Sequence, residues 1–282
     1  MDSSTRLLVS HVGGVFKLPC HYLGVYLKKT YETSSIVSLK RHPATREDDV
    51  VSIMVVGKTD GLYDPIEKAR EVIVWNPEQE GSPRFGKICA DLVDAIKTKP
   101  RVKTWRMMTV GEVEFRHSGL NVCPSIFMWD VPPRAFPIKN EGLIGSIFLN
   151  HGRRKRFTDL LKKAIPTYQV YEGIPPRDPF LAKASVVINI HARENPKAIE
   201  LHRISRCLAM GCVVLSEGTE DRMTKDFLIG AGLPVYFAPE GLTPPQFCEW
   251  VVDTLKGVGE VDKKENQDGF YSWFSSLEKH VI

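Results

Sequence analysis

The sequence predicts an α/β protein made of two halves, each built on a parallel sheet. Short apolar runs of strand length alternate with amphipathic stretches of helix length along most of the 282 residues, a pattern typical of parallel sheets. A segment with three prolines and no periodicity, Val131–Asn140, interrupts this pattern near the middle of the chain. A chain of this length accommodates two domains of ordinary size.

The first half is expected to form a domain over residues 1–135. We expect strands at Arg6–Ser10, Ile36–Leu39, Val50–Val56, Glu71–Trp75 and Ser125–Met128, and helices at Lys17–Tyr31 and Pro83–Lys97. Ser82 is a suitable N-cap for the second of these helices, because Pro83 follows it in the first helical position.

The second half, residues 136–282, repeats the alternation. We expect strands at Leu143–Leu149, Tyr168–Tyr171, Val186–Ile190, Cys212–Leu215 and Pro234–Phe237, and helices at Arg154–Ala164, Pro196–Met210, Asp221–Gly230, Thr243–Lys256 and Gln267–His280. The last helix can also pack back on the first domain. Two such domains joined by a linker leave a central cleft, which is the usual place for a ligand.

The stretch from Ala184 to Glu217 carries the most information about function. A polar junction, His191–Asn195, lies between an apolar strand and a helix, and Asn195 is a suitable N-cap. A helix start at the end of a parallel strand offers unpaired N–H groups and a positive dipole end, which favour phosphate. Arg203, expected two turns into the helix, adds a fork of donors that Glu200 can orient. An ordinary surface Glu–Arg pair is the plain alternative.

A second basic helix start follows the strand at Leu143–Leu149, where residues 150–156 read NHGRRKR. Gly152 permits close approach of a ligand, and Arg153 and Arg154 come first in the run of cations. Such a run is also typical of a solvated face. Two anion-binding helix starts in one domain predict a diphosphate ligand. No Asp-x-Asp pair follows a strand, so we expect arginines and helix ends, rather than a metal, to neutralise the phosphates.

Two strand ends in the first half offer candidate catalytic bases. His11 stands in SHVGGVFK, which contains neither the Rossmann G-x-G-x-x-G fingerprint nor a Walker A loop. Glu78 follows the strand EVIVW. We rank His11 first, because imidazole titrates near neutral pH without tuning. A capping histidine and a solvated acidic loop are the structural alternatives.

Composition argues against several classes of protein. The net charge is only +4 and the basic residues are dispersed, which argues against a dedicated nucleic-acid binder. The six cysteines lie far apart with no Cys-x-x-Cys pair, as expected of free thiols in a reducing compartment. We find no signal peptide and no apolar run long enough to span a membrane. A cytoplasmic location fits these features.

The chain resembles glycosyltransferases of the GT-B fold over roughly residues 70–220. The likeness rests on VIVWNPEQ, on NHGRR, and on VVINIHARENPKAIELHRISRCLAMGCVVLSE. The last segment is similar to exostosin-type enzymes, in which an arginine, here Arg203, stands eight residues before a Gly-Cys-x-x-Val strand. In length the chain is similar to small soluble enzymes of large DNA viruses and bacteria, chlorovirus glycan xylosyltransferases among them.

The resemblance implies two Rossmann-like domains facing a central cleft, with the nucleotide sugar bound by the second. It implies that Arg203 binds the donor diphosphate and that Glu200 and Glu217 line the donor pocket. Retaining GT-B enzymes carry two glutamates eight residues apart, and this chain has Ala198 and Arg206 there, which favours inversion. The expected donor-binding residues are Arg153, Arg154, His191, Asn195, Glu200, Arg203 and Glu217.

We therefore expect an inverting, metal-independent glycosyltransferase, with His11 or Glu78 as base and no cofactor. It would move a hexosyl or pentosyl group from a nucleotide-diphosphate sugar, with uridine favoured by its frequency in the family, to a glycan hydroxyl. Neither nucleic acid nor a membrane is an expected partner, and the location would be the host cytoplasm if the protein is viral. A non-catalytic nucleotide-sugar-binding module and a sugar-nucleotide epimerase are the alternatives.

Overall fold

The chain divides into two compact units, and each is described by itself. Unit 1 comprises Met1–Pro133 and Glu278–Ile282, and unit 2 runs Arg134–Leu277, so one boundary falls within the proline-rich segment. The computed structural model describes residues 5–11, 25, 27–28, 35–55, 61–78, 80–110, 112–125, 131–132, 135–148, 150, 152–172, 178–191 and 198–277. The expected cleft between the halves stays a prediction.

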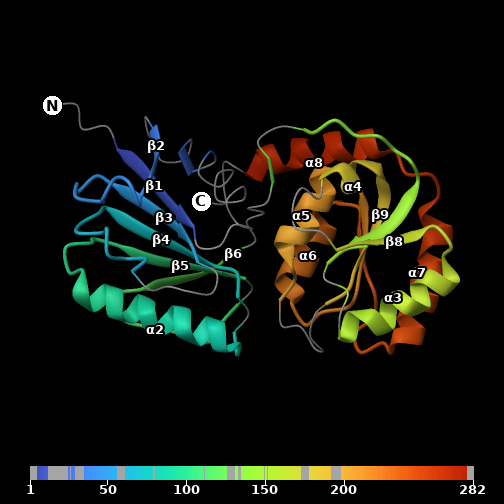
Figure 1. Ribbon diagram of the computed structural model, residues 1–282, viewed down its shortest axis with the longest axis horizontal. Helices are drawn as coiled ribbons and strands as arrows, with labels where there is room; N and C mark the ends of the chain where they lie inside the picture. The colour runs from blue at the N-terminus through green and yellow to red at the C-terminus, as the bar shows by residue number, and fades with distance from the viewer. Residues whose placement is uncertain are drawn as a thin grey trace. The chain divides into compact units, whose positions relative to one another are not determined.

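Unit 1 contains a six-stranded sheet in the order β2-β1-β3-β4-β5-β6, with every pair parallel. Its elements are β1 (Arg6–His11), β2 (Ser35–Ser38), β3 (Val50–Met54), β4 (Glu71–Asn76), α2 (Pro83–Thr98), β5 (Trp105–Val110) and β6 (Asn121–Ser125). Helix α2 lies along one face of the sheet (Figure 1). Ser82 caps it as predicted, because its hydroxyl accepts a hydrogen bond from the Phe85 N–H at 3.1 Å.

Strand β5 was not predicted, although its signal is visible. Its residues WRMMTV alternate between buried and half-buried positions, the period-2 pattern of a strand with one covered face. The expected strand at Ser125–Met128 is observed earlier, as β6, and residues 126–130 lie outside the described part of the chain. The expected helix Lys17–Tyr31 falls almost entirely outside it as well.

Unit 2 contains a five-stranded parallel sheet in the order β11-β10-β9-β7-β8. Its elements are β7 (Leu143–Ile147), α3 (Arg153–Ala164), β8 (Tyr168–Tyr171), α4 (Asp178–Lys183), β9 (Ala184–Asn189), α5 (Leu201–Ala209), β10 (Val213–Ser216), α6 (Arg222–Gly230), β11 (Val235–Phe237), α7 (Pro244–Val258) and α8 (Lys263–Leu277). Helices α3 and α7 pack together on one face, α5 and α6 cover the other, and α8 packs on α5 (Figure 1). The core lies between these layers.

The first strand of unit 2 marks the point where the strand order reverses. Strand β7 pairs with β8 on one side and with β9 on the other, so the connection from β7 to β8 and the connection from β9 to β10 run in opposite directions along the sheet. In open α/β sheets the crevice at the carboxyl ends of two such strands is where ligands bind. The predicted anion-binding turns, after β7 and after β9, therefore lie on the two sides of this crevice.

Helix α5 begins later than predicted. The expected start at Pro196 is wrong in the described part, because Ala198–Glu200 is not helical and the helix runs Leu201–Ala209. Glu200 has φ −76° and ψ 65°, and the Leu201 N–H bonds to the Ile199 carbonyl at 2.8 Å, which makes an inverse γ-turn. Burial of Ile199, whose N–H bonds to the Asp221 carboxylate at 3.0 Å, holds this turn. Arg203 consequently lies in the first turn of α5, not the second.

The last helix of unit 2 is fastened to the rest of that unit by buried polar groups. The Lys263 ammonium donates to the carbonyls of Leu181 and Ala182 at the end of α4, at 2.6 and 3.0 Å. The Gln267 amide donates to the Phe136 carbonyl at 3.1 Å, and the Asn140 amide donates to the Val261 carbonyl at 2.9 Å. Helix α8 thus holds the first residues of unit 2 beside its last ones. The expected contact of the last helix with the first domain stays a prediction.

Candidate functional site

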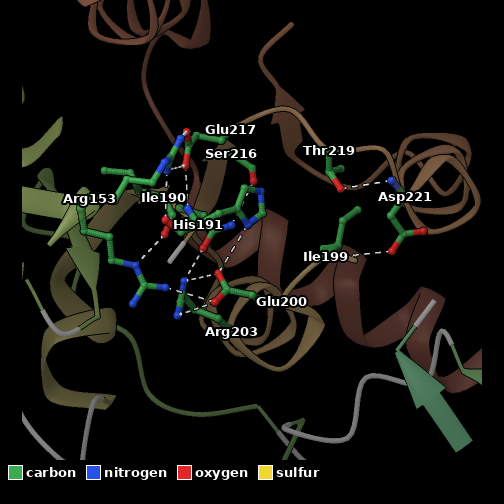
Figure 2. Close-up of polar contacts among 12 residues, drawn as sticks. Arg153, Ile190, His191, Ile199, Glu200, Arg203, Ser216, Glu217, Thr219 and Asp221 are labelled. Carbon is green, nitrogen blue, oxygen red and sulfur yellow. Dashed lines mark hydrogen bonds and ion pairs between the residues drawn. The ribbon is translucent and has the colours of Figure 1, made fainter. Parts of the chain in front are cut away.

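The candidate site lies at the carboxyl edge of the unit 2 sheet, where three connections meet. Helix α3 begins after β7, His191 follows β9, and Glu217 follows β10. Figure 2 shows side chains from these connections pointing toward one another, with Glu200 and Arg203 from the start of α5. Residues far apart in the chain thus form one polar cluster, which was predicted from sequence as a set of separate turns.

The upper part of the cluster is a bidentate ion pair between Arg153 and Glu217. The two guanidinium nitrogens lie 2.8 and 2.6 Å from the two carboxylate oxygens. The same carboxylate accepts the His191 backbone N–H at 2.6 Å, and Arg153 donates to the His191 carbonyl at 3.1 Å. The peptide groups on both sides of His191 are therefore held in place.

The lower part of the cluster centres on Glu200. Arg203 donates to both of its carboxylate oxygens, at 2.6 and 3.2 Å, and to the Asn189 side-chain oxygen at 2.7 Å. Arg154 donates to Glu200 at 3.1 Å and to the Ile190 carbonyl at 2.9 Å. Arg203 is only 7% exposed, so the alternative of an ordinary surface Glu–Arg pair is wrong.

The cluster contains more positive than negative charge among the described residues. Three guanidinium groups face two carboxylates, and two of the arginines, Arg154 and Arg203, also lie over the Phe148 ring at 4.8 and 5.8 Å. Burial and the neighbouring Arg203 lower the pKa of Arg154 to about 10. Burial alone would raise the pKa of Glu200, but Arg203, His191 and Arg154 outweigh it and hold this pKa well below its usual value. The cluster therefore favours an incoming anion.

Both helix starts at the site lack a side-chain cap. Helix α3 is preceded by Gly152, which has a positive φ of 56°, and α5 by Glu200, and neither residue caps a backbone N–H of its helix with its side chain. At α5 the Leu201 and Arg203 N–H groups are bonded to the carbonyls of Ile199 and Glu200. The uncapped start of α3, with its positive dipole end, adds to the attraction for phosphate.

A pocket of about 330 Å³ adjoins the cluster and shares two of its residues. Arg153 and Glu217 form one wall, and the aromatic rings of Phe157 and Phe247 form another. The rest of the lining comes from the start of α3 and the loops after β10 and β11: Arg156, Gly218, Thr219, Glu220, Pro239, Glu240, Gly241, Leu242, Thr243 and Pro244. Hydroxyl and carboxylate groups beside apolar rings suit a ligand that carries both polar and apolar faces.

The structure brings six of the seven predicted donor-site residues together. Arg153, Arg154, His191, Glu200, Arg203 and Glu217 all belong to the cluster. Asn195 lies outside the described residues. What each of the six binds stays a prediction.

The two candidate bases belong to unit 1. His11 is the last residue of β1, paired with Met54, rather than the first residue beyond the strand. Glu78 follows β4, where its N–H bonds to the Asn76 side chain at 3.1 Å and its carboxylate lies 3.4 Å from exposed Arg84. Their catalytic roles stay predictions.

Sequence reasoning missed three residues that support the cluster. Asn189 orients Arg203 and donates to the Ser216 hydroxyl at 3.0 Å, and Phe148 lies beneath two arginines. Asp221 fixes the turn before α5 through Ile199 (Figure 2). A polar residue at the end of an otherwise apolar strand was the available signal for Asn189. Nothing in the local pattern identified the other two.

The described residues hold no group of three or more His, Cys, Asp or Glu side chains arranged to bind a metal ion. In the same part of the chain no helix combines the length and the apolar character needed to cross a membrane.

Comparison with solved structures agrees with the predicted fold. No protein-family model matches the chain, and no curated protein matches it significantly. The structure is similar to that of the pneumococcal O-GlcNAc transferase GtfA, solved with UDP and GlcNAc, with a TM-score of 0.50 and 6% identity. The match covers 92% of this chain and 60% of the GtfA chain, so this chain spans about three fifths of the length of that one.

Weaker likenesses extend to two further transferases. T4 phage BGT, solved with UDP and Mn²⁺, gives a TM-score of 0.48 and 10% identity over 98% of this chain and 95% of that one. The calicheamicin glycosyltransferase CalG4 gives 0.41 and 12% over 99% and 98%. The chain therefore has the GT-B fold, with two Rossmann-like units built on parallel sheets.

Proposed function

We propose that the chain is a glycosyltransferase that moves a sugar from a nucleotide-diphosphate sugar to an acceptor hydroxyl. The observation that carries this proposal is the convergence of Arg153, Arg154 and Arg203 at the point of unit 2 where the strand order reverses. Largely buried arginines with an excess of positive charge, beside the uncapped start of α3, suit a diphosphate. The GT-B fold and the adjoining pocket agree with a nucleotide sugar as its carrier.

The chemistry follows from the charge of the leaving group. When the bond between the anomeric carbon and the diphosphate breaks, negative charge grows on the departing phosphate oxygen. Fixed donors at that position stabilise the transition state more than the ground state, which is usually the largest contribution to catalysis. In this proposal Arg203 and Arg153 or Arg154 supply those donors, Asn195 belongs to the same donor-binding site, and Glu200 and Glu217 hold the arginines in position.

The finer assignments extend the same proposal. Transfer is inverting and needs no metal, the donor is a UDP-sugar carrying a hexosyl or pentosyl group, and the acceptor is a glycan. A base from unit 1, His11 first and Glu78 second, removes the acceptor proton. The exostosin-like placement of Arg203 eight residues before Gly211 supports the donor assignment, and Ala198 and Arg206, in place of the paired glutamates, support inversion.

A thermal-shift panel of UDP-, GDP-, ADP- and dTDP-sugars tests the proposal. A ligand at a hundred times its dissociation constant should stabilise the fold by about 2.7 kcal/mol. Arg153→Gln should abolish the shift. The matched control is Lys155→Gln, two residues along α3, whose ammonium is exposed and paired with Asp159.

Product analysis then separates the proposal from its alternatives. Transfer of the sugar to an acceptor, or its slow transfer to water, supports the glycosyltransferase. Binding without turnover supports a non-catalytic module, and a changed sugar on the intact nucleotide supports an epimerase. The absence of a shift with every nucleotide sugar would overturn the proposal.

A further inference from the structure

His191 is a buried side chain in the middle of the charged cluster, and its ring makes no hydrogen bond within the described residues. Its side chain is 2% exposed. Hydrogen bonds to Glu217 and Arg153 hold its peptide groups, which fixes the backbone position from which the ring projects. A buried polar group that stays unbonded costs free energy, which points to a task that the unliganded protein does not show.

The surroundings of the ring hold charges of both signs (Figure 2). From α5, the Glu200 carboxylate lies 3.7 Å from the ring Nδ1, and Arg203 is bonded to that carboxylate. From α3 come Arg153 and Arg154, and from the end of β10 come Ser216 and Glu217. Arg193 and Glu194, one residue of each sign, follow in the chain outside the described residues.

Only one member of this cluster can change its charge near neutral pH. Arginines stay protonated there, and the pKa of Glu200 is held well below its usual range by Arg203, His191 and Arg154. The described charged groups of the unliganded cluster, three arginines and two glutamates, leave one surplus positive charge. A bound nucleotide-diphosphate sugar brings one negative charge on each phosphate and reverses that balance.

We infer that His191 takes up a proton from solvent when the nucleotide sugar binds, and that the resulting imidazolium supplies the positive charge that the arginine–glutamate cluster lacks toward the diphosphate. This inference rests on the proposed function and adds a proton coupling to it. Binding and protonation then strengthen each other by the same factor, as linkage requires. No bond of the donor breaks in this step, and the proton returns to solvent when the nucleotide leaves.

Isothermal titration calorimetry measures the coupling directly. The titrant is UDP-glucose, or GDP-glucose if that binds instead, because their phosphates do not titrate near neutral pH. Repeating the titration in two buffers of different ionisation enthalpy gives the number of protons taken up. We expect uptake of up to one proton and an affinity that rises by up to about tenfold for each unit that the pH falls across the histidine range.

Two variants assign the proton to a residue. His191→Gln should abolish the uptake and bind weakly at pH 6, yet approach the wild-type affinity at pH 8.5, where this inference predicts little proton uptake. A merely structural role would instead weaken binding equally at both pH values. His117→Gln is the matched control, because His117 in unit 1 also has an unpartnered ring nitrogen and should leave the uptake unchanged.

The outcomes are distinct. Binding without proton uptake between pH 6 and 8 overturns this inference and leaves the proposed function standing, whereas failure of every nucleotide sugar to bind overturns the proposed function and the inference together. If His191→Gln does not fold, the carbon-bound ring protons of the eight histidines report by NMR which one becomes charged on binding. A different histidine, or none, would also overturn the inference.

Discussion

Replacing Arg203 with alanine should destabilise unit 2, so the stability of this variant has to be measured before its ligand binding is interpreted. The guanidinium makes three hydrogen bonds to Glu200 and Asn189 at 2.6–3.2 Å and is nearly buried. Without it, the Glu200 side chain, which is 18% exposed, keeps Arg154 as its main partner. Breaking a largely buried pair in this way leaves part of the carboxylate charge without compensation.

The expected loss of unfolding free energy follows from values typical of buried ion pairs. Removing one partner of such a pair costs about 3–5 kcal/mol, and for a domain of 150–250 residues each kcal/mol shifts the melting temperature by about 2–4 °C. Arg203→Ala should therefore lower the melting temperature by at least about 6 °C. Lys155→Ala, on the exposed side of α3, should change it by about 1–2 °C at most.

Thermal and urea unfolding, followed by circular dichroism, measure the change, and a double variant tests its cause. If the cost arises from the stranded carboxylate, Arg203→Met with Glu200→Gln should be less destabilised than the two single variants added together. It should still fail to bind nucleotide, because the fork of donors is gone. An Arg203→Ala protein within about 1 kcal/mol of wild type, or strict additivity in the double variant, would refute the reasoning.

Three further predictions concern pH, metal and the base. Because the folded-state pKa of Glu200 lies below its unfolded value, its contribution to stability is present above about pH 4.3 and is lost as the pH falls below it. Urea midpoints measured from pH 7 to 3 should therefore fall more steeply for wild type than for Glu200→Gln. Parallel curves for the two proteins would contradict this. Transfer should survive excess EDTA, and an activity that returns only with added Mn²⁺ or Mg²⁺ would overturn metal independence. His11→Ala should lower turnover by about a hundred- to ten-thousandfold with nucleotide affinity unchanged, while a loss below fivefold beside a large loss for Glu78→Gln would reverse their ranking.

Strand and helix positions in unit 2 were largely predictable, because most of its elements carry the hydrophobic pattern of either a strand or a helix. The strand at Tyr168–Tyr171 is observed at the predicted bounds, and Asp221 and Thr243 each precede a helix near its expected start. The misses have local causes. Helix α4 is only six residues long, too short to show periodicity, and α5 starts late because distant Asp221 anchors the turn before it.

The residues of the candidate site were predictable from their position at strand ends, but their partners were not. Parallel strands bring their carboxyl ends to one edge, so Arg153, His191 and Glu217 had to lie near one another. The pairing of Arg153 with Glu217, rather than with Glu200, depends on side-chain directions that the sequence does not encode locally. The role of Phe148 depends on the same three-dimensional packing.

The polar fastening of α8 has a consequence for how unit 2 can be handled. Because Phe136 and Asn140 at its beginning are bonded to Gln267 and Val261 near its end, the two ends of the unit are neighbours in space. Neighbouring ends are what allow a domain to be excised, inserted elsewhere or circularly permuted. The half of the chain that holds the arginine cluster thus has neighbouring ends, and the described side chains of the candidate site come from the strands and helix starts of that half.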